Sequence, residues 1–261
     1  MQQFFEDPEL QKFFLVFVRL SGLVVFAPPF MNPRLSVQMK GGFVFFLAVA
    51  MMPVVPALPR IVPYNTIDLA FAMASEVLIG FIIGFSVRLL FTIYEMAGEF
   101  VDKQVGFAMA SLVDPQTDVT VSILGSMFMN LALFIFIKVG GHLWIIEAFA
   151  GSFRSLPLLQ GDLNIDGIHY HMGELFMKIF SSALGIVLPI IAVVTLVYVA
   201  QGFLVRTIPQ LQIFVIGFIF TITIGLTSIQ IMLKNFYPTS LELFEFFKHR
   251  IWFMVSHLNH G

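Results

Sequence analysis

The chain lacks cysteine altogether and has few charged residues for its length of 261 residues. Without cysteine it can form no disulfide, no thiolate metal site and no cysteine nucleophile. Charged residues make up 11% of the sequence and the formal net charge is −2, which favours neither a nucleic-acid partner nor an anionic lipid surface. The motifs of serine hydrolases, zinc proteases and phosphate-binding loops are also missing. We therefore expect no enzyme, no metal and no cofactor.

Apolar residues dominate what is present. They make up 58% of the sequence, and the mean hydropathy is +0.92. A helix needs roughly 20 apolar residues to cross a bilayer. About six apolar runs approach that length, near 13–31, 41–58, 67–93, 119–150, 175–205 and 211–233. The composition therefore predicts an all-α, integral membrane-type protein, and no shift in composition marks a second domain within 1–261.

Charges and prolines interrupt these runs in places where lipid-facing helices tolerate them poorly. The interrupting residues are Arg19, Pro28–Pro29, Pro53, Pro56, Glu76, Arg88 and Pro189. Helices that pack on other protein, or that surround a water-filled path, tolerate such residues well. The pattern predicts bent, proline-broken helical hairpins built to pack into a larger helical assembly. The first two runs resemble hairpin arms with a turn at Asn32-Pro33-Arg34, and Leu156 to Met172 is expected to be a polar connector.

Glu76, Gly80 and Gly84 recur every four residues, so they share one face of a helix. Glycines at this spacing allow a second backbone to approach closely. Two interpretations remain open. In one, the face serves plain helix packing; in the other, Glu76 faces a partner or an aqueous path, because a carboxylate at membrane depth rarely faces lipid.

A second polar stripe lies on the next stretch and leads into a segment of small side chains. On one continuous helix Arg88, Glu95, Glu99, Asp102 and Gly106 would lie within a narrow arc, which is most often a solvated face. The following segment ends at an Asp-Pro pair and suits a structure that must bend and move, as a plug or gate does. Its candidate residues are Gly106, Phe107, Ala108, Met109, Ala110, Ser111, Leu112, Asp114 and Pro115.

The C-terminal stretch at about 240–258 is expected to be an amphipathic helix. Its apolar face would hold Leu243, Phe244, Phe247, Ile251, Met254 and Val255. Such a face could lie on a membrane surface or dock on a partner.

Taken in order, short motifs across residues 19 to 210 resemble the FliR/SctT family, the export-gate subunits of flagellar and related type III secretion systems. The matching pieces are Arg19-Leu-Ser-Gly22, Ala27-Pro28, Pro33, Glu76-x-x-x-Gly80-x-x-x-Gly84, Ala97-Gly98-Glu99-x-x-Asp102-x-Gln104-x-Gly106, Asp114-Pro115, Gly141-His142, Ser152-Phe153 with Pro157, Leu188-Pro189, and Arg206-x-x-Pro209-Gln210. The Ala-Gly-Glu run and the Gly-Gly-His favour the flagellar branch.

The resemblance implies a single copy of this chain in a helical complex with FliP-like and FliQ-like subunits. That complex would lie in the bacterial inner membrane within the flagellar basal body, much of it on the periplasmic side. It would bind an FlhB-like switch protein and surround the path of unfolded export substrates, with a plug at about Gly106–Thr120. The residues expected in assembly and helix packing are Arg19, Glu76, Gly80, Gly84, Gly98, Glu99, Asp102, Gln104, Arg206 and Pro209.

The alternative is an ion-coupled secondary transporter that uses Glu76, Glu95 and Asp102 as coupling carboxylates. No inverted repeat is apparent, and Lys and Arg are shared almost evenly between the two sides that six spans would define. Both features favour the export gate.

Overall fold

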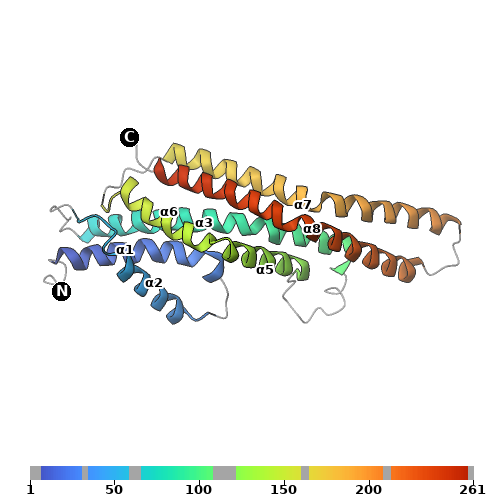
Figure 1. The fold of residues 1–261 in the computed structure, drawn as a ribbon, viewed down its shortest axis with the longest axis horizontal. Helices are drawn as coiled ribbons and strands as arrows, with labels where there is room; N and C mark the ends of the chain where they lie inside the picture. Colours follow the sequence, from blue (N-terminus) through green and yellow to red (C-terminus); the bar gives the residue numbers. More distant parts are fainter. Residues whose placement is uncertain are drawn as a thin grey trace. The chain divides into compact units, whose positions relative to one another are not determined.

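The computed structural model describes residues 7–30, 35–58, 66–107, 122–159, 165–207 and 213–257. Within these ranges the chain is helical and has no strand, which confirms the all-α prediction (Figure 1). The elements are α1 (Pro8–Phe26), η2 (Pro28–Phe30), α2 (Val37–Met51), α3 (Thr66–Val105), α5 (Ile123–Lys138), α6 (Gly141–Ser155), α7 (Ile165–Thr207) and α8 (Ile213–Ser256).

Three of the described helices are long and apolar enough to cross a membrane, within Leu69–Val105, Asp166–Thr207 and Gly217–Ser256. The helices α5 and α6 would add a fourth span if the two together form a single span, with a bend of 71° between them. These helices confirm the integral membrane-type prediction. They are fewer than the apolar runs, because α1 carries three charged residues and α2 has only 15 residues.

The bend between α5 and α6 divides a run that the sequence presents as continuous, 119–150. Gly140 has a φ of +76°, in the left-handed region that glycine adopts without strain. A left-handed glycine is a common end for a helix, so α5 ends here and α6 starts in a new direction.

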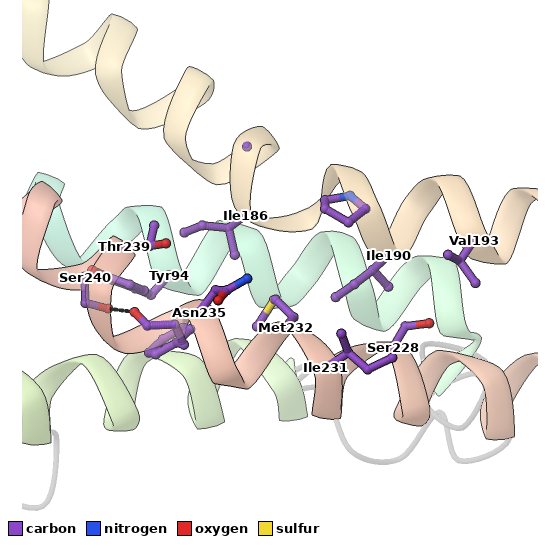
Figure 2. Close-up of a pocket in the computed structure, with 13 residues that line it drawn as sticks. Tyr94, Ile186, Ile190, Val193, Ser228, Ile231, Met232, Asn235, Thr239 and Ser240 are labelled. Carbon is purple, nitrogen blue, oxygen red and sulfur yellow. Dashed lines mark hydrogen bonds between the residues drawn. The ribbon is translucent and has the colours of Figure 1, made fainter.

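Two of the long helices continue through internal prolines, of which Pro189 was expected to interrupt its run. Pro189 lies inside α7 and Pro238 inside α8, so α8 joins the 211–233 run to the C-terminal stretch. Each proline lacks the N–H that would bond to the carbonyl four residues earlier, and it bends the helix without ending it. Figure 2 shows α7 changing direction between Ile186 and Ile190. The expected connector from Leu156 to Met172 is too long, because α7 begins at Ile165.

Two compact units make up the chain. Unit 1 is Met1–Leu89, Val139–Phe176 and Glu245–Gly261, and unit 2 is Leu90–Lys138 and Met177–Phe244. The single-domain expectation stays a prediction, since α3, α7 and α8 each run from one unit into the other.

In unit 1, α1 begins with a capped turn and packs on α2. The Asp7 carboxylate accepts a hydrogen bond from the Glu9 N–H at 3.0 Å, and Pro8 occupies the first turn, where its missing N–H costs nothing. The rings of Phe13 and Phe45 meet edge-on at 5.4 Å. These contacts give the hairpin arms that the first two runs predict, while the expected turn at 32–34 lies outside the described residues.

Unit 2 has an aromatic core built by α3, α5 and α8. Phe236 of α8 lies against Tyr94 of α3 at 5.4 Å and Phe128 of α5 at 5.7 Å. Phe136 of α5 is in edge-on contact with Phe91 and Phe244, at 5.3 and 5.4 Å. Edge-to-face pairs add stabilisation beyond the apolar area that they bury.

The apolar face predicted for the C-terminal helix is present and is buried inside the chain. Its six residues, Leu243, Phe244, Phe247, Ile251, Met254 and Val255, are all at most 5% exposed. In unit 1, Trp252 lies so close to Gly151 of α6 that a Cβ there would be 3.3 Å from the indole ring. The face therefore needs neither a membrane surface nor a partner to cover it.

Candidate functional site

The first polar site, in unit 1, is built around Arg19 of α1 and Glu76 of α3. The Arg19 Nε–H donates to Glu76 Oε2, and both side chains are buried, at 0% and 2% exposure. A charge in such a place is tolerated only when it is paired and hydrogen-bonded. The two residues are 57 positions apart in sequence, and neither shares a local motif with the other.

The rest of the Arg19 guanidinium binds the end of α6. Nη1 donates to the Ser152 hydroxyl at 3.2 Å, and Nη2 donates to the Leu156 carbonyl at 3.1 Å. The guanidinium also lies over the Phe153 ring, 4.2 Å from its centre. We call Arg19, Glu76, Ser152, Phe153 and Leu156 the Arg19 cluster. It ties together three elements that are far apart in sequence.

Glycines bring the α1 and α3 backbones close enough for this pair to form. A Cβ on Gly80 would overlap the Arg19 carbonyl oxygen, and one on Gly84 would be 2.5 Å from the Leu23 carbonyl oxygen. Gly22 of α1 contributes from the other side, since its Cβ would be 2.5 Å from the Val77 carbonyl oxygen. Of the two interpretations of this face, close helix packing fits the geometry of the chain. Glu76 faces Arg19 and not water.

The second polar site, in unit 2, holds the C-terminal end of α3 to the start of α5. The Asp102 carboxylate accepts hydrogen bonds from the Ser122 hydroxyl and from the Leu124 N–H, the latter at 3.2 Å. The Ser122 hydroxyl in turn accepts from the Gly125 N–H at 2.7 Å. A Cβ on Gly98 would overlap the Gly125 backbone. These five residues form what we call the α3–α5 clasp.

The clasp works as a helix cap supplied by another helix. The first N–H groups of α5 have no partner within that helix, and the positive end of its dipole attracts a carboxylate. Asp102, 5% exposed, supplies that carboxylate from α3. The segment predicted to act as a plug lies in the chain between Asp102 and Ser122, the two residues that the clasp joins.

The end of α3 is also attached to α7 and α8 within unit 2. The Gln104 side chain donates to the Thr195 hydroxyl at 3.2 Å, and the Gln104 carbonyl accepts from the Tyr198 hydroxyl at 2.7 Å. Gly225 of α8 makes room for the Val105 side chain, which a Cβ would approach to 2.6 Å. The sequence motifs single out three residues of this helix end, and each makes a contact. Gly98 and Asp102 hold the helix end to α5, and Gln104 holds it to α7.

Gly106 follows directly and is in the left-handed region, with a φ of +96°. A Cβ there would be 3.2 Å from the Phe218 ring.

The remaining predicted site residues make fewer contacts. Glu99 is half exposed, and its Oε2 lies 4.0 Å from the Nζ of Lys103, four residues later. Arg206 is exposed near the end of α7 and makes no ion pair with any described residue. Phe107 is the last described residue of this segment; Ala108, Met109, Ala110, Ser111, Leu112, Asp114, Pro115 and Pro209 lie outside the described residues.

Sequence reasoning missed several partners. Ser122, directly before an apolar run, carries a helix-start signal that could have been found. Gly125, Thr195 and Tyr198 carry no local signal, because their importance comes from residues elsewhere in the chain. The structure also gives no support to the transporter interpretation, since Glu76 and Asp102 both have fixed structural partners.

No group of three or more His, Cys, Asp or Glu side chains that could hold a metal ion occurs among the described residues. The polar side chains of the Arg19 cluster and the clasp bind other parts of the same chain. Their chemistry suits the fixing of helices and offers no nucleophile paired with a base.

Removal of the Asp102 carboxylate should weaken the clasp. We expect Asp102→Ala to cost about 1–2 kcal/mol, the usual cost of losing a helix cap with a buried N–H. The loss should be local, so amide hydrogen exchange at 124–126 should become faster. Glu99→Ala, three residues away and half exposed, is the matched control and should leave those amides unchanged. Equal protection in the Asp102 variant and the wild type would contradict the role of the cap.

Known bacterial export proteins resemble this chain over nearly its whole length. The family model of bacterial export proteins, family 1, matches residues 10–247. Among curated relatives, the chain is 30% identical to the flagellar biosynthetic protein FliR of Pectobacterium carotovorum subsp. carotovorum, with 90% of this chain and 89% of the relative covered. It is 28% identical to FliR of Bacillus subtilis (strain 168), with 88% and 92% covered. It is also 26% identical to the surface presentation of antigens protein SpaR of Shigella flexneri, with 88% of each covered. The chain belongs to the bacterial export proteins of family 1, the FliR/SctT family.

Proposed function

We propose that this chain is a core subunit of the flagellar type III export gate. In this proposal a single copy assembles with FliP-like and FliQ-like subunits in the bacterial inner membrane, within the basal body and largely on its periplasmic side. The complex forms the channel for unfolded flagellar substrates, and an FlhB-like switch protein binds to it. The observation that carries the proposal is the family match across residues 10–247, joined to relatives with flagellar biosynthetic names.

The surfaces of the long helices support a role inside an assembly. In the apolar windows of α7 and α8, only 28% and 22% of the residues are buried within the chain. Large apolar side chains such as Phe180, Leu196 and Phe203 are more than half exposed. Neighbouring subunits or lipid must cover these surfaces, since exposed apolar patches of this extent mark interaction sites.

The proposed plug is the segment at about 106–120. A gate for unfolded chains of any sequence cannot rely on specific side-chain recognition, so it needs a deformable seal that weakly contacts its cargo. Small and flexible side chains suit such a seal, because methionine repacks at low cost. The α3–α5 clasp supports this proposal, since it fixes the helix ends that precede and follow the segment.

The proposal is tested by export itself. In a strain of a flagellated bacterium from which the corresponding gene has been deleted, expression of this chain should restore secretion of flagellar substrates into the medium. The Asp102→Ala variant should restore less secretion than the wild type, because its clasp is weakened. Secretion that stays absent, although the chain accumulates in the membrane together with its partner subunits, would count against the export function.

Changes at the proposed plug should leak ions without loss of assembly. Gly106→Ala places a Cβ at a positive φ, which costs about 1–2 kcal/mol and should shift the start of the segment. Deletion of residues 107–113 removes most of the seal. We expect both variants to retain the partner subunits and to raise the ion conductance of the cells that express them. Gly202→Ala, in open space on α7, is the control. Normal secretion with an unaltered leak would contradict the plug.

Arg206 is proposed as an assembly contact. It is exposed, and no described residue pairs with its charge. We expect Arg206→Gln to leave the thermal stability of the chain unchanged but to lose partner subunits during purification. Retention of the full complex would contradict this role.

A further inference from the structure

Unit 2 contains a cavity of about 330 Å³ between α3, α7 and α8. These are the three described helices that are long and apolar enough to cross a membrane. The cavity lies beside the bend of α7, where Gly185 and Pro189 are exposed at its edge. A Cβ on Gly185 would have no neighbour within 4 Å, so the cavity has an open side there.

The two ends of the cavity differ in polarity, as Figure 2 shows. Ile190, Val193 and Ile231 line one end. Ser228, also at that end, has its hydroxyl occupied, because it donates to the Ile224 carbonyl at 2.8 Å. An occupant of this end therefore meets an apolar wall with no free polar group.

The other end offers hydrogen-bond donors. Asn235 and Thr239 lie there on α8, and the Asn235 side chain points into the cavity in Figure 2. No described residue hydrogen-bonds to the Asn235 amide or the Thr239 hydroxyl. Lys234, which precedes Asn235, is exposed and has no ion pair within the described part of the chain. None of the residues that line the cavity is charged.

We propose that this cavity binds a membrane phospholipid, with an acyl chain at the Ile190–Val193 end and the ester and phosphate groups at the Asn235–Thr239 end, within reach of Lys234. Ester and phosphate oxygens accept hydrogen bonds, which matches an end with free donors and with the exposed Lys234 next to Asn235 on α8. The acyl chain matches the uncharged, apolar end, because its burial is favourable there. Lysine and polar residues next to a long apolar run are also typical of the membrane–water interface, where lipid headgroups lie. The inference rests on the cavity and does not depend on the proposed export role.

The test is native mass spectrometry of the full chain, purified in mild detergent from cell membranes with whatever subunits accompany it. The wild type should retain one phospholipid mass per copy of this chain. Gly185→Leu should lose it, because the new side chain extends into the open side of the cavity. This change meets no steric clash and raises helix propensity, so the fold should be preserved. Gly202→Leu is the matched control, since it lies on the same helix in equally open space, outside the cavity, and should retain the lipid.

A second pair of variants tests the headgroup contact. Lys234→Gln should reduce phospholipid retention roughly tenfold, the effect of losing one charge-assisted hydrogen bond. Lys103→Gln, also exposed, should not reduce it. If Gly185→Leu does not fold, Val193→Trp fills the other end of the cavity and should likewise lose the lipid. Equal retention in the cavity and control variants would overturn the proposal. So would a wild type that carries only detergent, or only a partner chain against these helices.

Discussion

Replacement of Glu76 with leucine is expected to lower the melting temperature of the purified chain by roughly ten degrees, the shift expected from a loss of about 3–5 kcal/mol in a protein of this size. The large effect comes from Arg19, whose guanidinium is 0% exposed and would keep its charge without a carboxylate partner. Ser152 and Leu156 would still accept hydrogen bonds from it, but neither carries a charge. The measurement is thermal unfolding in mild detergent.

The double variant Arg19→Met with Glu76→Leu separates loss of the ion pair from loss of packing. Without either charge, no buried charge is left unpaired, and apolar side chains of similar size often replace a buried pair at little cost. We therefore expect the double variant to melt well above Glu76→Leu. Glu99→Leu, at a half-exposed acid, should change the melting temperature little. A double variant as unstable as the sum of the two single changes would show that Arg19 and Glu76 contribute independently.

Replacement of Gly80 with valine is expected to prevent stable packing of α1 on α3. Even the first added carbon would overlap the Arg19 carbonyl oxygen. That oxygen belongs to the backbone of α1, so it cannot move aside as a flexible side chain would. The helices would have to separate, which would also pull Arg19 away from Glu76. We expect a loss of more than about 3 kcal/mol, at the upper end for overpacking, and little full-length chain in the membrane.

Glycines of α2 provide the control for this change. Gly41 and Gly42 lie in an apolar helix of the same unit, and a Cβ on either would have no neighbour within 4 Å. Gly42→Val should therefore accumulate like the wild type. If Gly80→Val accumulates and melts like Gly42→Val, then the close approach of α1 and α3 is not what stabilises unit 1.

Periodicity was sufficient to find the faces of single helices. The spacing of Glu76, Gly80 and Gly84 predicts that they share one helix face, and the structure places that face against α1. The pattern from Leu243 to Val255 predicts an apolar face, which is buried. These features depend on residues three and four apart, which any single helix brings together.

Partners across the fold could not be predicted in the same way. Glu76 is paired with a residue 57 positions earlier, and Gly98 lies against Gly125 through packing that no local pattern encodes. The bend at Gly140 was hidden in an uninterrupted apolar run, because hydropathy carries no information on φ. Conversely, Pro189 suggested a break, yet α7 continues through it.

The measurement that tests the central claim most directly is native mass spectrometry of this chain co-expressed with its chromosomal neighbours and extracted in mild detergent. The account predicts a mixed complex in which one copy of this chain is joined by several copies of two small hydrophobic subunits. The Gly106→Ala complex should have the same composition, because the change affects the plug and not the assembly. A lone monomer or homodimer, with the neighbours present but unbound, would contradict the export-gate proposal.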